Sequence, residues 1–182
     1  MGELPSSTSS VTVRKALQSD ADAIADIWLD GWHDGHRGLV PHELVEVRTP
    51  ASFTARAAAR IGDTTVATVD GTVAGFVMVV GDEVEQVYVS SLHRGTGVAA
   101  ALMAEAERGV RANGHTTAWL AVVAGNARAR AFYLSAGWRD EGRFVYSATS
   151  DSGAIDVPCH RYTKFVGSGS PDEGPKEATD PG

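Results

Sequence analysis

The feature that most constrains this chain is a block of three β-branched runs that leads directly into a glycine-containing loop. Residues 64–90 read TTVATVDGTVAGFVMVVGDEVEQVYVS, with turn residues at 70–71 and at 81–83. This spacing predicts three antiparallel strands joined by tight turns, which form a meander. The loop HRGTGVA follows at 93–99, and apolar residues then repeat at helical spacing over 97–113. We expect that helix to end at Asn113 and Gly114.

The loop at 93–99 connects a predicted strand to a predicted helix without proline, asparagine or aspartate. A helix that starts there presents unpaired backbone N–H groups at the positive end of its dipole, where an anion binds well. Gly95 and Gly97 let the backbone approach such an anion without an intervening side chain. The dinucleotide-binding fingerprint fits poorly, because position 100 is alanine and the preceding strands form a meander.

The remaining segments alternate between strand and helix character. Helices are predicted after the N-cap candidates Ser19 and Asp20, within 51–61 and over 126–136. Further strands are predicted at 11–17, 116–123, 142–149 and 156–166. Strands with helices interspersed among them predict an α/β fold of the mixed α+β kind, built on a sheet.

Length, composition and charge predict one domain between two tails. The chain has 182 residues and 43% of them are hydrophobic, which suits a single core. Residues 1–10 and 167–182 are rich in Ser, Gly, Pro and acids, so we expect flexible tails around a domain at 11–166. The formal net charge is -7, and -3 of it belongs to 167–182, so the domain is mildly acidic without a nucleic-acid footprint.

Cysteine use and hydropathy bear on location. Cys159 is the only cysteine, which excludes an intramolecular disulfide and fits a reducing, cytoplasmic setting. No apolar stretch approaches the roughly 18 residues that a membrane span needs. The first ten residues lack the basic and apolar regions of a signal peptide. We therefore expect a cytoplasmic protein that binds neither membranes nor nucleic acids.

Two short motifs resemble the signatures of the GNAT superfamily of acyl-CoA-dependent N-acetyltransferases. RGTGVA at 94–99 resembles the R/Q-x-x-G-x-G/A pattern, with alanine where glycine is commoner. VVAGNARARAFYLSAGW at 122–138 resembles the second signature through Asn126, Tyr133 and the final Gly-Trp pair. The resemblance covers roughly residues 11–166 and implies a mixed, mostly antiparallel sheet of about seven strands flanked by about four helices.

The resemblance implies acetyl-CoA as the cofactor. The amides of the loop would hold its pyrophosphate, and the strand before the loop would pair through its backbone with the pantetheine arm. In the family this strand is bulged and parts from the strand expected here at 116–123. The expected cofactor-binding residues are Val87, Tyr88, Val89, Arg94, Gly95, Thr96, Gly97, Val98, Ala99, Asn126, Arg128, Arg130 and Tyr133.

The aminolysis of a thioester requires a neutral amine, a donor for the oxyanion, and a proton or hydrogen bond for the departing thiolate. By resemblance, Tyr133 is the acid beside the sulfur and a backbone amide near Val89 serves the oxyanion. The resemblance also implies a glutamate base on the strand before the loop, either Glu83 or Glu85. In a regular strand both share a face with Val87 and Val89, and we favour Glu85 because it is closer to the thioester end.

In the family, the first helices and the last strand pair usually recognise the acceptor. The expected substrate-binding residues are Trp32, His33, His36 and Tyr146, although Tyr146 has the alternative of packing against the sheet. No cysteine or paired carboxylate completes a zinc site with these histidines, so we expect no metal.

These observations predict an enzyme, an N-acetyltransferase. It would transfer the acetyl group of acetyl-CoA to a primary amine of a small molecule or a peptide, by direct attack in a ternary complex. The alternative is a non-catalytic sensor or regulatory module that binds acyl-CoA. A phosphotransferase is disfavoured because the chain has no G-x-x-x-x-G-K-[ST] motif. The family resemblance also leads us to expect a homodimer.

Overall fold

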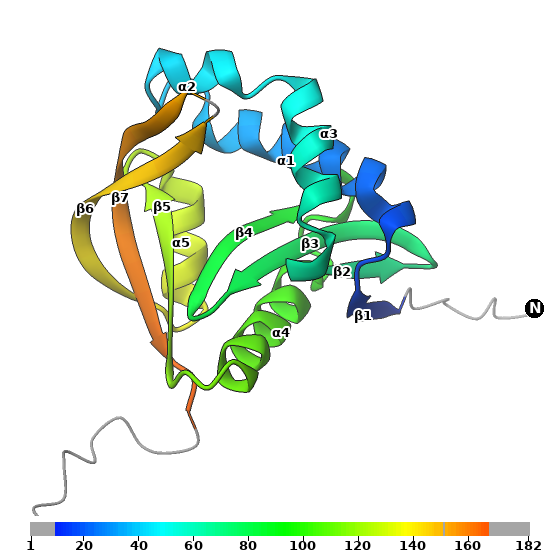
Figure 1. Ribbon diagram of the computed structural model, residues 1–182. Helices are drawn as coiled ribbons and strands as arrows, with labels where there is room; N and C mark the ends of the chain where they lie inside the picture. Colours follow the sequence, from blue (N-terminus) through cyan, green and yellow to red (C-terminus); the bar gives the residue numbers. More distant parts are fainter. Residues whose placement is uncertain (1–9, 151, 168–182) are drawn as a thin grey trace, which may run out of the picture.

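A seven-stranded sheet organises the computed structural model, which describes residues 10–150 and 152–167. The strands are β1 (Val11–Lys15), β2 (Thr64–Val69), β3 (Thr72–Val80), β4 (Glu83–Val89), β5 (Thr117–Val123), β6 (Arg139–Ser150) and β7 (Gly153–Phe165). Their spatial order is β1-β2-β3-β4-β5-β7-β6 (Figure 1). Neighbouring strands are antiparallel except β4 and β5, which run parallel. The mostly antiparallel mixed sheet is therefore confirmed.

In the described residues the helices lie between strands in chain order, which begins with β1 and ends with β7. The described residues contain α1 (Ala21–His36), α2 (His42–Val47), α3 (Pro50–Ala59), α4 (Val98–Ala112) and α5 (Ala127–Ser135), with short 3-10 turns at 18–20, 61–63 and 91–93. About four α-helices were expected, and the additional one is α2, which has only six residues. None of the helices in the described part of the chain is long and apolar enough to cross a membrane.

The predicted meander is present as β2, β3 and β4. Asp70 and Gly71 connect the first two strands with positive φ angles of 51° and 82°, the conformation of a two-residue type I′ hairpin. Asn113 is the C-cap residue of α4 and Gly114 follows with a φ of 88°, as the sequence predicted. Apart from residues 10 and 167, the expected tails lie outside the described residues.

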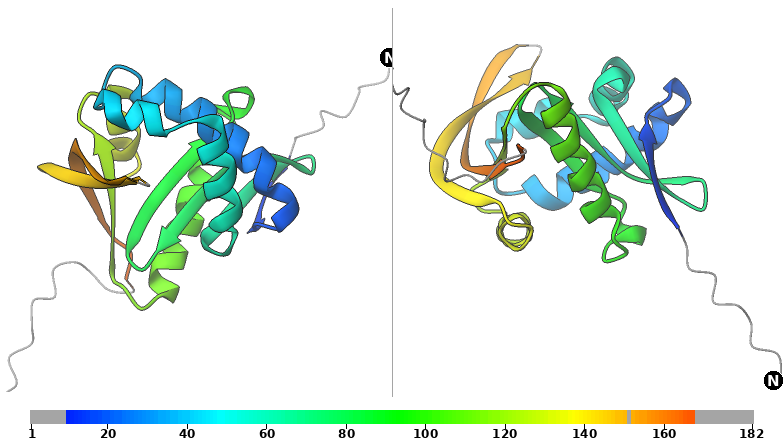
Figure 2. Two further views of the ribbon diagram at one scale, coloured as in Figure 1. Left: turned by 45° about the horizontal axis from the view of Figure 1, so that its top comes forward. Right: turned by 90° about the horizontal axis from the view of Figure 1, so that it is seen from below.

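Helices cover both faces of the sheet (Figure 2). On one face α4 packs with α5 against the strands, around a core that includes Val77, Leu102 and Val110. On the opposite face α1 and α3 enclose a second core that includes Trp28 and Phe53. α1, α3 and α4 each bury apolar residues on one face, so the sheet is the layer that the two cores share.

Gly75 in β3 lies close to both β4 and α4. A Cβ atom at this position would lie 2.8 Å from the carbonyl oxygen of Tyr88. It would also lie 3.0 Å from Leu102 Cδ1 and 3.1 Å from Val98 Cγ1. A main-chain oxygen within the sheet cannot move aside as a flexible side chain can, so only glycine fits here.

We expect Gly75→Ala to lower the free energy of unfolding by about 1–3 kcal/mol, the usual effect of overpacking a core. Gly62→Ala is the matched control, since a Cβ at Gly62 meets no atom within 4 Å. Urea unfolding followed by circular dichroism measures both variants. Equal midpoints for the two variants would show that the sheet and α4 have room at Gly75.

Candidate active site

β4 and β5 pair only at their beginnings and then part. Glu83 is the one residue of β4 that the register places opposite β5, where it faces Trp119. The Trp119 main-chain N–H donates to the Asp82 carbonyl at 3.0 Å, and its indole N–H donates to the Asp82 carboxylate at 3.1 Å. A pocket of about 840 Å³ lies between the diverging strands. The expected parting of the two strands is therefore present.

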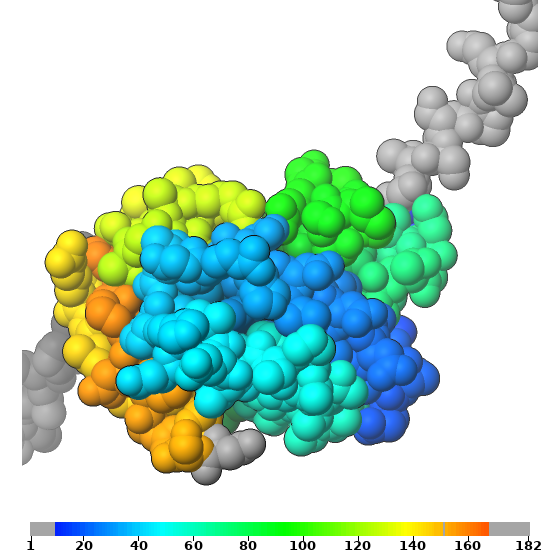
Figure 3. Space-filling model, turned by 90° about the horizontal axis from the view of Figure 1, so that it is seen from above, coloured from blue at the N-terminus to red at the C-terminus, as the bar shows by residue number. Residues whose placement is uncertain are grey.

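The first helices close one side of this pocket. Seen from that side, α1 to α3 (blue to cyan) lie between the β6–β7 hairpin and the green loop before α4 (Figure 3). Two glycines one turn apart let α1 come this close. A Cβ at Gly31 would overlap the Tyr88 ring, and one at Gly35 would lie 2.9 Å from Asn126 Nδ2. The small face of α1 thus packs directly on β4 and on the beginning of α5.

β4 contains the expected bulge. Met78 pairs with Gln86, and the next residue of β3, Val79, pairs with Val84. Glu85 is therefore the extra residue of β4 and has no partner in β3. A bulge at this position bends the strand next to the pocket.

The bulge also reverses the alternation of side chains along β4. Val84 before the bulge and Val87 and Val89 after it all pack against the core on the α4 side. Glu83, the neighbour of Val84, therefore faces the opposite side. Glu83 therefore does not share a face with Val87 and Val89, as it would in a regular strand.

The glycine loop lies at one end of the pocket. Gly95 and Gly97 have φ angles of 76° and 87°, and Gly97 is the N-cap residue of α4. The first hydrogen bond of the helix runs from the Ala101 N–H to the Gly97 carbonyl at 3.0 Å. The preceding amides have no partner inside the helix, so this end of the pocket presents N–H donors at the positive end of a helix dipole.

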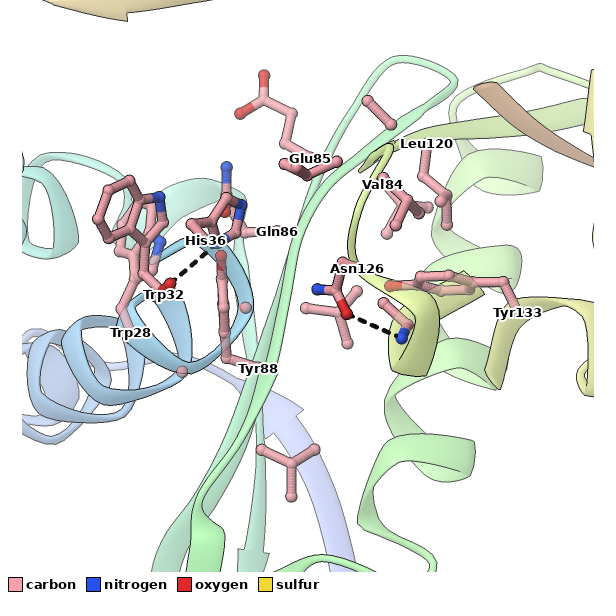
Figure 4. A pocket seen from close by; sticks show the side chains of 18 of the residues that line it. Trp28, Trp32, His36, Val84, Glu85, Gln86, Tyr88, Leu120, Asn126 and Tyr133 are labelled. Carbon is pink, nitrogen blue, oxygen red and sulfur yellow. Dashed lines mark hydrogen bonds between the residues drawn. The ribbon is translucent and has the colours of Figure 1, made fainter. Parts of the chain in front are cut away.

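The second motif forms the opposite side of the pocket. The Asn126 side chain caps α5 by accepting a hydrogen bond from the Ala129 N–H at 3.1 Å. Two turns further on, Tyr133 points its hydroxyl from α5 toward β4 (Figure 4). Burial raises the pKa of this hydroxyl, so it is a neutral donor at physiological pH.

Most of the predicted site residues line the pocket. They are Trp32, His36, Glu83, Glu85, Val87, Tyr88, Val89, Arg94, Gly95, Gly97, Ala99, Asn126, Arg128, Tyr133 and Tyr146. Four predicted residues do not line it. His33 packs its ring against Trp32, the Thr96 hydroxyl donates to the His93 carbonyl at 2.5 Å, and Val98 is fully buried in the core.

The fourth is Arg130, which the structure places in a polar network with β6 and β7. Its guanidinium donates to the Tyr162 hydroxyl at 3.2 Å and to the Asp140 carboxylate at 3.1 Å. Burial opposes the ionisation of Asp140, but hydrogen bonds from His160, the Gly142 N–H and Arg130 lower its pKa to about 2. Arg130 and Tyr133 are three residues apart and share a face of α5, so it is the hydrogen bonds to Tyr162 and Asp140 that hold the Arg130 guanidinium against β6 and β7.

The two glutamates of β4 have different partners. Arg60 donates to Glu85 at 2.7 Å and also to Asp63 at 2.8 Å. Glu83 accepts a hydrogen bond from the Tyr146 hydroxyl at 3.0 Å. Burial raises the pKa of Glu83, and the hydrogen bond from Tyr146 offsets this only in part. Glu83 is therefore a carboxylate whose pKa is raised by burial, whereas Glu85 is held in an ion pair with Arg60.

Sequence reasoning missed several polar residues of the pocket. Gln86 and three arginines, Arg48, Arg56 and Arg60, line it, and so does His93, which the motif alone marked as a surface residue. Arg56 and Arg60 are one helical turn apart, and this i, i+4 spacing was the available signal. Arg48 is buried and donates to the Thr149 carbonyl of β6 at 2.8 Å, a partner that no local pattern indicates.

His36 is a neutral imidazole in this pocket. Its ring stacks on Trp32 with centroids 5.0 Å apart, and Nδ1 lies 3.0 Å from the Trp32 carbonyl. Burial lowers the pKa of His36 to about 4. This hydrogen bond raises the pKa, whereas the charge of Arg48 lowers it further. Because Nδ1 carries the proton that bonds the carbonyl, Nε2 is left as an acceptor.

We expect His36 to make the fold sensitive to acid. Its folded pKa of about 4 lies below its usual value of 6.5, so the unfolded chain binds a proton first as the pH falls. The stability is complete above about pH 6.5 and falls by about 3 kcal/mol as the pH approaches 4. Urea unfolding at several pH values should show a shallower decline for His36→Gln than for the wild type.

The matched control is His42→Gln, since the His42 side chain is 84% exposed. This variant should keep the steep wild-type decline between pH 6.5 and 4. Parallel pH profiles for the wild type and His36→Gln would show that His36 does not carry the effect.

Metal-ligating side chains and reactive cysteines often act in catalysis, and the described part of the chain gives no sign of either. Within residues 10–150 and 152–167, no group of three His, Cys, Asp or Glu side chains is arranged to hold a metal ion. Cys159 lines the pocket but is 3% exposed, and burial raises the pKa of its thiol to about 11. It is therefore a protonated thiol at physiological pH and a poor nucleophile.

Comparisons with known proteins agree with this geometry. The sequence profile of the acetyltransferase (GNAT) family matches residues 22–138. Among curated protein sequences, none matches the chain closely enough to count as a relative.

Solved structures give the same fold at low sequence identity. A GCN5-related N-acetyltransferase from Rhodopseudomonas palustris has a TM-score of 0.68 at 23% identity, covering 90% of this chain and 99% of its own. PaiA N-acetyltransferase from Thermoplasma acidophilum in complex with coenzyme A has a TM-score of 0.64 at 17% identity, covering 86% and 99%. YncA from Salmonella typhimurium with its cofactor acetyl-CoA has a TM-score of 0.63 at 19% identity, covering 91% and 100%.

At these identities the structures establish the fold alone, whereas the profile match spans both motifs, the parted strands and the helix of Tyr133. The chain belongs to the acetyltransferase (GNAT) family.

Proposed function

We propose that this protein is an acetyl-CoA-dependent N-acetyltransferase that acetylates a primary amine of a small molecule or a peptide. The observation that carries the proposal is the pocket between β4 and β5, which joins the glycine loop, Tyr133 and Glu83 in one continuous space. Such a space admits a cofactor and an acceptor together, which suits direct attack in a ternary complex. The buried, protonated thiol of Cys159 argues against an acyl-enzyme route.

The residues present fit acetyl-CoA. The amides around Gly95 and Gly97 would bind the pyrophosphate, because a Cβ at either glycine meets no atom within 4 Å and the space above the loop is open. Arg128, exposed at the pocket rim, would add positive charge near the phosphates. The edge of β4 beyond Glu83 has backbone groups that β5 does not pair, and the amides of the pantetheine arm would bind there.

When bound, acetyl-CoA supplies an acetyl thioester, whose C–S bond breaks as the amine forms the new C–N bond. Glu83 is suited to accept the proton that the amine loses, because its carboxylate is raised in pKa and faces the pocket. Glu85, favoured from the sequence, is the weaker choice since Arg60 holds it. The Tyr133 hydroxyl is suited to donate a proton or a hydrogen bond to the departing sulfur.

A thiol-release assay with acetyl-CoA tests the function across amino acids, polyamines, aminoglycosides and short peptides. We expect thiol release that depends on at least one class of amine. Calorimetric binding of acetyl-CoA without release for any acceptor would contradict the proposal and support a non-catalytic acyl-CoA sensor.

We expect Tyr133→Phe to lower kcat by about 100-fold or more while the Kd for acetyl-CoA changes little, because only the hydroxyl is lost. Steady-state kinetics and calorimetry measure the two constants. Tyr162→Phe is the control, since it removes a buried hydroxyl that lies outside the pocket. Unchanged kcat in Tyr133→Phe would reject the role of this hydroxyl.

We expect Gly97→Val to raise the Kd for coenzyme A about tenfold. A β-branched residue at a φ of 87° is strained by about 1–2 kcal/mol. The loop relieves this strain by changing shape, and its amides then no longer fit the pyrophosphate. Gly114→Val is the control, because Gly114 has a φ of 88° and equally open surroundings at the other end of α4. If both variants bind coenzyme A as the wild type does, the loop does not hold the pyrophosphate.

A further inference from the structure

The guanidinium of Arg56 lines the pocket without a hydrogen-bond or ion-pair partner in the described part of the chain. Its Cζ atom lies 4.8 Å from the centroid of the Trp28 ring. Within residues 10–150 and 152–167 it donates to no hydrogen-bond acceptor and forms no ion pair. Burial lowers the pKa of Arg56, yet an arginine stays charged. Its donors are therefore left for a ligand that brings an anion.

The other arginines on this side of the pocket are already engaged. Arg60 is paired with Glu85 and Asp63, and Arg48 donates to the Thr149 carbonyl. The carboxylate of Glu85, the acid near Arg56, is thus hydrogen-bonded to a different guanidinium. Glu85 acts on Arg56 only through its charge, and within the described part of the chain the Arg56 guanidinium has no ion pair or hydrogen bond of its own.

A second positive group lies near the same spot. Burial raises the pKa of the Tyr88 hydroxyl, and the charges of Arg56 and Arg48 both act in the opposite direction. Both guanidiniums are therefore close enough to Tyr88 to influence it. Tyr88 faces α1 in the middle of β4 (Figure 4), so this positive region lies beside the parted strands.

A carboxylate is available at a different point of the same pocket. Glu83 lies at the beginning of β4 and accepts a hydrogen bond from Tyr146. The acceptor side of the pocket therefore presents cations in one place and an acid in another. This arrangement complements a molecule that carries an amine and an anion together, and it opposes a polyamine, which has no group for Arg56 to bind.

On the basis of the proposed N-acetyltransferase, we propose that the acceptor is a primary amine that also carries a carboxylate, as an amino acid does, and that Arg56 binds this carboxylate. The carboxylate would take the donors of the guanidinium, and the amine would be directed toward Glu83. Buried Trp32, Leu44 and Val157 line the pocket with apolar surface, which suits an apolar side chain on the acceptor.

Binding tests the inference apart from turnover. The full chain, saturated with coenzyme A, is titrated by calorimetry with leucine, leucinamide and 3-methylbutylamine. Leucinamide and 3-methylbutylamine keep the amine of leucine but lack its carboxylate. Phenylalanine with 2-phenylethylamine and methionine with 3-(methylthio)propylamine extend the comparison. We expect at least about tenfold tighter binding for an amino acid than for its partner amine. Arg56→Met should reduce this ratio to about one.

Two variants control for the loss of charge and for folding. Arg108→Met removes an exposed arginine of α4 that pairs with Glu105, and it should keep the wild-type ratio. Arg56→Lys keeps the positive charge without the planar pair of donors and should keep part of the preference. Circular dichroism verifies that each variant is folded.

The outcomes separate the two proposals. Preference for the amines without a carboxylate, binding of no amino acid in the panels, or a preference that survives in Arg56→Met would overturn the inference. Carboxylate-dependent binding that Arg56→Met abolishes supports it, even if acetyl-CoA then releases no thiol. That last result would reject the proposed acetyl transfer and leave the ligand assignment standing.

Discussion

The separation of β4 from β5 is the constraint on which the rest of this structure depends. Two hydrogen bonds between Trp119 and Asp82 hold the strands together at one end, and the bulge at Glu85 bends β4 just beyond them. Separate cores on the two faces then stabilise the parted arrangement. Because unpaired strand edges are unfavourable away from water, the gap suits a ligand with amide groups of its own.

The pocket handles charge locally, in a protein whose formal net charge is -7. At the loop end, N–H groups of α4 and the pair of Arg94 with Asp34 surround the place proposed for phosphates. Arg56 and Glu83 are two further charged groups that line the same space. Charges elsewhere are screened beyond about 8 Å at physiological ionic strength, so these groups dominate what binds.

Much of the fold and of the site could be predicted from local patterns. Local patterns predicted the hairpin at Asp70, the glycine loop before an amphipathic helix, and the positions of Asn126 and Tyr133. Each of these features depends on only a few neighbouring residues, because local steric limits determine the backbone conformation. The family resemblance implied a bulge in β4, but local patterns could not place it at Glu85, because a bulge depends on the register with the partner strand. The direction of Arg130 was set by Asp140, a partner on another element.

The sequence by itself determined the order of strands and helices, the positions of the turns and the residue types that the pocket would need, because these follow from backbone conformation and periodicity. Only the tertiary structure decided which acid is free and which arginine lacks a partner. Arg48 meets β6, more than one hundred residues away in the chain, and Arg60 at the end of α3 meets Glu85 of β4. Such pairings arise when distant segments are packed together, and a local pattern carries no information about them.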